Sequence, residues 1–175
     1  MLKNTIVAAL NQQVAMEGYA SFNYLAMASW CDREGLDGCA EFLYRQSDEE
    51  RMHMLKLFRY INEMDSHALS PAITQVQTDY PSVTNLFENV FASEQAVTAS
   101  INQLVDLCYK EQDHATLNFL QWYVTEQREE EALMRQILDK IRLIGETPGS
   151  LYWIDQELHK INVLEAKAAA QPAKA

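Results

Sequence analysis

Apolar residues recur with the period of an α-helix along most of the chain. In the first helical stretch, Leu10, Glu17 and Tyr24 follow one another at seven-residue intervals, so their side chains share one face of a helix. Glycines in the segment REGLDG interrupt this pattern, and Gly145 ends the last long one. The pattern predicts four long helices, at about residues 4–32, 39–64, 83–110 and 115–144.

A segment without helical period, residues 65–82, separates the second and third predicted helices. It contains two prolines, and a connection of this length within a compact domain needs a structural reason. A connection that travels the full length of a bundle, in place of a simple up-down-up-down order, provides that reason. Ser82 or Asn85 is suited to cap the helix that follows.

A short amphipathic segment, residues 151–161, follows the fourth helix, and the low-complexity tail at 163–175 is expected to be disordered. The predicted fold class is therefore all-α. One domain over residues 1–162 forms a four-helix bundle with one long crossover and a short C-terminal fifth helix. One stripe of the fifth segment is apolar, and we expect it to pack against copies of itself at a symmetry axis. The stripe consists of Leu151, Ile154, Leu158 and Ile161.

Composition and charge narrow the class of protein further. Glycine (5 residues) and proline (4) are scarce and 48% of residues are hydrophobic, a balance that favours helices over sheets. The formal charge of -11 should repel nucleic acid and anionic membranes, so neither is an expected partner, and it should attract cations. No apolar run approaches the ~20 residues that span a bilayer, and the N-terminus lacks the features of a signal peptide. We expect a cytoplasmic protein whose three cysteines are reduced and serve as small core or surface residues.

Polar residues interrupt each apolar stripe at one level, near the middle of each helix. Buried carboxylates are costly and repel one another at close range, and cations among them would remove that conflict. Carboxylate oxygens with a little imidazole suit iron or manganese better than the thiolate-rich sets of many structural zinc sites. The residues present are the right number for two metal ions that share a bridging carboxylate. They are Glu17 in the first helix, Glu50 and His53 in the second, Glu94 in the third, and Gln127 and Glu130 in the fourth.

The spacing of these residues adds to the metal interpretation. Glu50 and His53 are three residues apart in EERMH, so they point the same way from a helix. A lone Glu-x-x-His is weak evidence because it occurs by chance, but acids that interrupt all four stripes favour a metal centre. Di-iron bundles combine one Glu from each of two helices with Glu-x-x-His from the other two. This chain has three quarters of that pattern, since its fourth helix carries QREE and lacks the histidine.

Two further features each have two interpretations. Tyr24 lies two turns from Glu17 on the same face, and it is either a core tyrosine with a satisfied hydroxyl, which is favoured, or a redox-active neighbour of the metals. The acidic run TEQREEE adds further glutamates, among them Glu126 and Glu129. Together with Glu49, these form either another cation site beside the first or a solvated acidic face.

The combined motifs resemble those of the bacterial non-haem ferritins. The resemblance covers nearly the whole chain and is carried by EERMHM, NFLQWYVTEQREEE and the position of Glu94. It implies a four-helix bundle with one long crossover and a short fifth helix, whose copies assemble into a hollow shell of about two dozen subunits. It also implies an iron-storage ferroxidase, in which dioxygen oxidises Fe(II) and the ferric product is stored as a mineral.

The resemblance further implies roles for individual residues. Tyr24 matches a tyrosine implicated in electron transfer, and Gln127 matches a position beside the iron pair. One iron would be held by Glu17, Glu50 and His53, and the second by Glu50, Glu94 and Glu130, with Glu50 bridging. A third iron would be held by Glu49, Glu126, Glu129 and Glu130.

Some positions depart from related families or have no explanation from the sequence. Bacterioferritins bind haem through a methionine directly after the glutamate of the first Glu-x-x-His motif. Arg51 occupies that position here and Met52 is one residue late, about 100° around the helix, so we expect no haem. Gly18, directly after Glu17, costs roughly 1 kcal/mol relative to alanine in a helix interior. Alternative functions are a di-metal oxygenase or catalase-like enzyme of the same fold, and a structural helical oligomer that its acids only solubilise.

Overall fold

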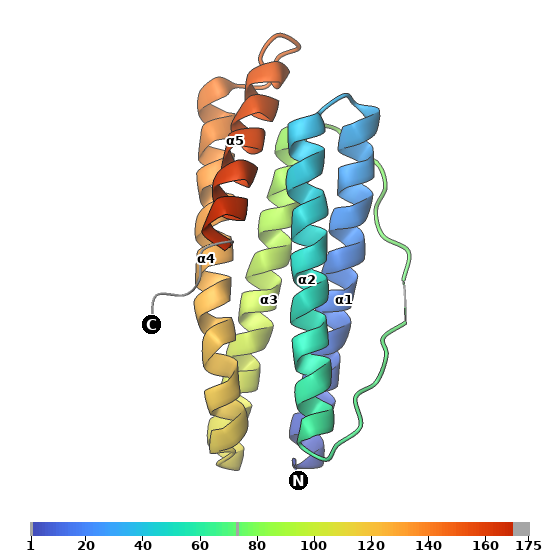
Figure 1. The fold of residues 1–175 in the computed structure, drawn as a ribbon, viewed down its shortest axis with the longest axis vertical. Coiled ribbons are helices and arrows are strands. Elements are labelled where there is room, and N and C mark those ends of the chain that lie inside the picture. Colours follow the sequence, from blue (N-terminus) through green and yellow to red (C-terminus); the bar gives the residue numbers. More distant parts are fainter. Residues whose placement is uncertain (1, 73, 170–175) are drawn as a thin grey trace.

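The computed structural model describes residues 2–72 and 74–169, and the regular structure in these ranges consists of five helices (Figure 1). No helix in the described part of the chain is long and apolar enough to cross a membrane. The predicted all-α fold, with four long helices and a shorter C-terminal one, is confirmed. The helices are α1 (Asn4–Arg33), α2 (Asp37–Glu63), α3 (Val83–Glu111), α4 (His114–Ile144) and α5 (Leu151–Ala169).

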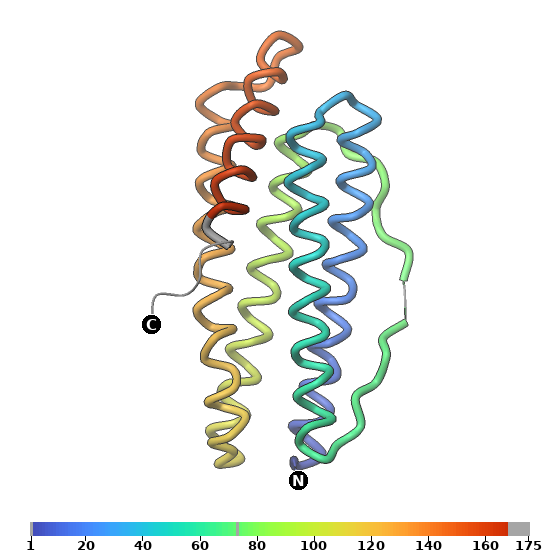
Figure 2. The backbone as a smooth tube through the Cα atoms, viewed as in Figure 1, coloured from blue at the N-terminus to red at the C-terminus, as the bar shows by residue number. Residues whose placement is uncertain are grey.

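The connection between α2 and α3 runs along the length of the bundle beside α1, as the green trace in Figures 1 and 2 shows. Helices α2 and α3 therefore run in the same direction, and the predicted long crossover is confirmed. Hydrogen bonds hold the crossover near both ends of α1. Leu69 N donates to Asn11 Oδ1 at 2.7 Å, and the guanidinium of Arg33 donates to Asp79 Oδ1 at 2.7 Å.

Side chains cap the start of α3 and of α4. Ser82 Oγ accepts a hydrogen bond from Asn85 N at 3.1 Å, and Asp113 Oδ1 accepts one from Thr116 N at 3.0 Å. These bonds satisfy backbone N–H groups that have no partner within the helix. Of the two caps expected for the third helix, the structure uses Ser82. Gly145 follows the last turn of α4, as the sequence predicts.

The core consists of two apolar clusters at the two ends of the bundle, with a polar layer between them. Leu10 and Leu57 belong to one cluster, and Phe42 and Phe87 belong to the other. All four side chains are fully buried. The predicted inner stripes supply both clusters, because apolar residues before and after the level of Glu17 fall on opposite sides of that layer.

Gly18 lies where the crossover and α2 approach α1 closely. A β-carbon at this position would be 3.2 Å from Met54 Sδ and 3.2 Å from Pro71 Cγ, which is tighter than ordinary van der Waals contact. Glycine therefore provides the space through which the crossover packs on α1. This contact explains why the helix tolerates the cost of a glycine beside Glu17.

Helix α5 packs on its own subunit, along α2 and α4, and returns from one end of the bundle toward its middle (Figure 1). It continues to Ala169, beyond the predicted end at residue 161. Residues 163–169 of the predicted disordered tail are therefore helical, and residues 170–175 of that tail lie outside the described ranges.

The predicted packing of the fifth helix's apolar stripe at a symmetry axis is wrong. Ile154, Leu158 and Ile161 are 0%, 1% and 5% exposed within the single chain and belong to its own core. The stripe packs within the chain because α5 folds back onto α2 and α4. The apolar pattern of the fifth helix alone does not show which surface will cover it. Any contact between subunits through α5 must use its outer face.

The first turn of α2 contacts α5 closely. A β-carbon at Gly38 would overlap the backbone carbonyl of Asp155, so only glycine permits this approach. The carboxylate of Asp155 accepts a hydrogen bond from Cys39 N at 2.9 Å. Leu36, the N-cap residue of α2, makes no side-chain cap, and Asp155 supplies that function from α5.

We predict that Ile154→Ala destabilises the protein by about 2–4 kcal/mol, because it leaves a cavity where α5 meets the core. Leu164→Ala on the same helix is the matched control, since Leu164 is 63% exposed and its loss should cost within ~0.5 kcal/mol. Thermal and denaturant unfolding of both variants measures the difference. Equal effects would show that α5 is not docked as described.

Candidate metal centre

The four long helices each place one glutamate in the polar layer between the apolar clusters. Glu17 on α1, Glu50 on α2, Glu94 on α3 and Glu130 on α4 are 0%, 1%, 0% and 6% exposed. Burial raises the pKa of Glu50 well above its usual range, and the charges of the other three glutamates raise it further. The structure therefore brings the four predicted acids together at one buried level.

His53 lies within this layer and faces two of the glutamates. Its Nδ1 is 3.4 Å from Glu50 Oε2 and 4.0 Å from Glu17 Oε2. Burial, with a smaller effect of the Lys56 charge, lowers the pKa of His53 to about 4. The imidazole is therefore neutral at pH 7 and keeps a lone pair for a metal.

Three buried atoms in this group have no hydrogen-bond partner among the described residues: Glu17 Oε2, Glu50 Oε2 and His53 Nδ1. Ligand atoms of these residues lie within 4.8 Å of one another. Buried polar atoms are rarely left unpaired, because each costs roughly 1–3 kcal/mol. Two carboxylate oxygens and an imidazole nitrogen are a donor set that fits an iron ion.

Glu94 is held in place by side chains from two other helices. The hydroxyl of Tyr24 donates to one carboxylate oxygen, and Gln127 Nε2 donates to the other at 3.1 Å. Burial, followed by the charges of Glu94 and Glu50, raises the pKa of Tyr24 well above its usual range, so this tyrosine remains a donor. Its hydroxyl is thus satisfied within the core by a predicted metal ligand, which fits both the core and the redox interpretation of the sequence.

Two glutamines that the sequence interpretation missed also hold the acids. Gln13 Nε2 donates to Glu17, and Gln46 Nε2 lies 3.3 Å from Glu130 Oε2. Ser100 Oγ in turn donates to Gln13 Oε1 at 2.6 Å and fixes the orientation of that amide. Gln13 precedes Glu17 by four residues, which is the spacing of neighbours on one helix face, and Gln46 precedes Glu50 by four and so shares that face of α2 while it contacts Glu130 of α4. That spacing was the signal available in the sequence.

The second predicted acidic group surrounds a cavity of about 320 Å³ beside the polar layer. Glu49, Glu126, Glu129 and Glu130 all line it. Glu130 belongs to both groups, and His53 Nε2 lies 3.9 Å from Glu126 Oε1, so the cavity adjoins the layer. Glu129 is the outermost member, with a side chain that is 65% exposed.

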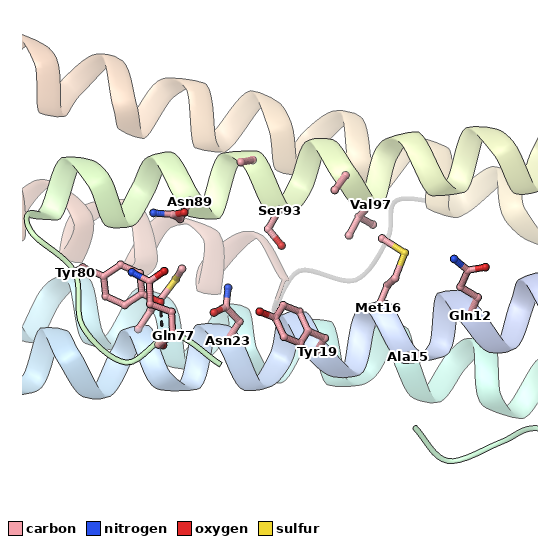
Figure 3. Close-up of a pocket in the computed structure, with 13 residues that line it drawn as sticks. Gln12, Ala15, Met16, Tyr19, Asn23, Gln77, Tyr80, Asn89, Ser93 and Val97 are labelled. Atoms are coloured by element: carbon pink, nitrogen blue, oxygen red, sulfur yellow. Dashed lines mark hydrogen bonds between the residues drawn. The ribbon is translucent and has the colours of Figure 1, made fainter. Parts of the chain in front are cut away.

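A groove of about 550 Å³ between α1 and α3 is separate from both acidic groups (Figure 3). Tyr19, Asn23 and Ser93 point into it from the two helices, and Tyr80 of the crossover lies at one end. None of the described residues that line the groove is charged. It therefore lacks the anionic oxygen ligands that hard cations prefer, and the polar layer remains the candidate metal centre.

A four-helix bundle with one crossover, whose buried middle layer combines four glutamates with one histidine, defines the class of carboxylate-bridged di-metal bundle proteins. A family model described as a ferritin-like domain matches residues 7–144. The chain belongs to the ferritin family, the iron-storage class that the sequence predicts.

Individual relatives agree with this assignment over almost their whole length. A bacterial non-heme ferritin of Campylobacter jejuni is 44% identical over 167 residues, which cover 95% of this chain and all of the relative. One from Escherichia coli O157:H7 is 38% identical and covers 93% of this chain and 98% of the relative. The solved open pore ferritin of Archaeoglobus fulgidus is 40% identical, with a TM-score of 0.88 over 91% of this chain and 98% of that one.

We predict that Glu130→Gln flattens the pH dependence of the metal-free protein's stability. Burial, and next the charge of Glu49, raises the pKa of Glu130 from 4.5 to about 9. The folded chain therefore keeps a proton that the unfolded chain releases above pH ~4.5. The stability this group contributes is present below that pH and is lost as pH rises toward 9, by at most about 1.4 kcal/mol per pH unit.

Denaturant unfolding of metal-free protein at about pH 5, 7 and 8.5 measures this slope. Glu88→Gln removes one charge from an exposed position on α3 and serves as the control. Parental slopes in both variants would contradict the assignment of the proton to Glu130.

Proposed function

We propose that the protein is a ferroxidase subunit that oxidises Fe(II) with dioxygen in the polar layer and stores the ferric product inside a shell of about 24 copies. The observation that carries the proposal is the set of unpaired, buried ligand atoms on Glu17, Glu50 and His53. Glu94 and Glu130 complete the same layer from the other helix pair. Full-length similarity to bacterial non-heme ferritins supports this reaction over that of a di-metal oxygenase.

In the proposed centre, two Fe(II) ions are the substrates and share Glu50. One ion takes Glu17, Glu50 and His53, and the second takes Glu50, Glu94 and Glu130. The position of Glu50 supports the shared role, because its carboxylate interacts with those of Glu17, Glu94 and Glu130.

The side chains perform two tasks in this reaction. Carboxylates bind Fe(III) more strongly than Fe(II) and so favour loss of one electron from each ion to dioxygen. Gln127 and Tyr24 hold Glu94, and Gln13 holds Glu17, so that the ligands keep their positions while the charge on the metals changes. The apolar clusters on both sides limit the access of water to the layer.

We expect His53→Ala and Glu94→Ala each to slow the fast oxidation of the first irons by at least about tenfold, because each variant removes a ligand from one position. Stopped-flow absorbance after mixing Fe(II)-loaded, anaerobic protein with dioxygen measures this phase. Glu88→Gln is again the control. Parental rates in both alanine variants would place the oxidation elsewhere.

Particle mass distinguishes the alternatives that share this fold. A closed shell that retains iron after oxidation supports storage. A monomer or dimer that turns over a small organic molecule or hydrogen peroxide would instead support the oxygenase or catalase-like function. A monomer or dimer without either reaction would support the structural alternative.

The proposal includes a third iron in the cavity lined by Glu49, Glu126, Glu129 and Glu130. Its support is the contact of this cavity with the polar layer through Glu130 and His53. The alternative is a solvated acidic face that only raises the local concentration of cations.

We predict that Glu126→Ala and Glu129→Gln lower iron occupancy at the third position several-fold while the paired positions stay filled. A diffuse negative field should barely respond to the loss of one charge among 25 acids. Anomalous diffraction from crystals soaked anaerobically in Fe(II) measures the occupancies. Three peaks at parental occupancy in both variants would rule out the third site and leave the two-metal centre standing.

Two expectations from the sequence remain predictions. The protein should bind no haem, since Arg51 occupies the methionine position of bacterioferritins. Met52 is the next residue of α2, about 100° around the helix, and it is 62% exposed. A cytoplasmic location is also expected.

A further inference from the structure

The last turns of α5 lie against the cavity of the proposed third iron. Glu165 lines this cavity together with Glu49, Glu126, Glu129 and Glu130. We propose that Glu165 is an additional carboxylate ligand for the cation in this cavity, supplied by α5, so that cation binding and the docking of α5 stabilise each other. The inference rests on the proposed third site and adds to it a residue from a fifth helix.

Glu165 lies among the cavity's other acids, since it lines the same cavity as Glu49 and Glu126. Glu165 is itself half-buried, whereas its neighbours Ala166 and Lys167 are exposed. The carboxylate thus faces the bundle and not the open solvent.

Arg45 connects α5 directly to this cavity. Its Nε donates to Asn162 Oδ1 at 2.7 Å, and another guanidinium nitrogen donates to Glu49 Oε2 at 3.1 Å. Asn162 and Glu165 are three residues apart and therefore share one face of α5. The same arginine that orients Glu49 consequently sets the rotation of α5 that brings Glu165 to the cavity.

The start of α5 is fixed independently, through the hydrogen bond from Cys39 N to Asp155 and the close contact at Gly38. Because α5 is held at both Asp155 and Asn162, the direction and rotation of the helix at residue 165 are nearly fixed. The position of Glu165 is therefore a consequence of packing along the whole helix.

Two buried side chains place possible ligand atoms at this cavity. Glu130 is 6% exposed and aims its carboxylate at the cavity from α4. His53 is also 6% exposed, and its Nε2 lies 3.9 Å from Glu126 Oε1. Ligand atoms of Glu49, His53 and Glu126 lie within 4.8 Å of one another.

Charge balance in the cavity points the same way. Five carboxylates line it, and Arg45 is the one basic residue among the described residues that do so. Partly buried carboxylates that outnumber their counter-charges repel each other, and a divalent cation relieves this repulsion. The oxygen-rich ligand set suits Fe(II) and other hard divalent cations.

The test compares Glu165→Gln, which keeps the size of the side chain and removes its charge, with the parent and with the exposed Glu88→Gln. Crystals soaked anaerobically in Fe(II) give anomalous peaks for the paired and third positions. We expect a several-fold loss of occupancy at the third position in Glu165→Gln alone, with the pair unchanged. Parental occupancy at the third position in Glu165→Gln overturns the role of Glu165 and leaves the third site intact. A parent without a third peak overturns the proposed third site and this inference together.

A second measurement follows α5 itself. Hydrogen exchange of the backbone amides of α5, in assembled protein with and without anaerobic Fe(II), should slow several-fold on metal binding in the parent and in Glu88→Gln. In Glu165→Gln this protection should disappear, although the metal-free exchange of α5 stays parental. Equal protection in all three proteins overturns the coupling between the cation and α5.

Discussion

The burial of several carboxyl groups at one level is the constraint on which the rest of the structure depends. Each group loses its hydration, and each ionised neighbour raises the cost of ionising the next, so the pKa of Glu50 rises well above its usual range and that of Glu130 reaches about 9. Protons or metal ions both relieve this cost, and they compete for the same oxygens. Metal binding to such a layer is thus linked to proton release, and the affinity for iron must increase as pH rises.

Hydrogen-bond donors limit this cost without removing the binding capacity of the layer. Gln13 satisfies one oxygen of Glu17 and leaves the other, Oε2, without a partner beside His53. Tyr24 and Gln127 instead donate to the two oxygens of Glu94. The donors are amides and a phenol, which stay uncharged at neutral pH, so they orient the acids without supplying the positive charge that would replace a cation.

Most of the fold and of the buried layer of acids could be predicted from the sequence, because both depend on helix periodicity. Residues seven apart must share a face, so Leu10, Glu17 and Tyr24 reveal the core and its interruption together. The docking of α5 depends instead on Gly38 and Asp155, which are far apart in the sequence and carry no periodic signal. The space at Gly18 likewise depends on Pro71 of the crossover.

The histidine missing from the fourth helix has a structural consequence for Glu130. In QREE, residues 127–130, Gln127 and Glu130 stand at the positions of Glu and His in the Glu-x-x-His motif, so a carboxylate replaces the imidazole there. With no imidazole on that turn, the carboxylate of Glu130 is the contribution of α4 to the paired layer and also lines the adjoining cavity. If Glu130 serves both proposed cation positions, their occupancies are interdependent, since a charge held on one side changes the cost of ionising Glu130 for the other. The departure from the symmetrical di-iron pattern therefore places one carboxylate at both the polar layer and the acidic cavity.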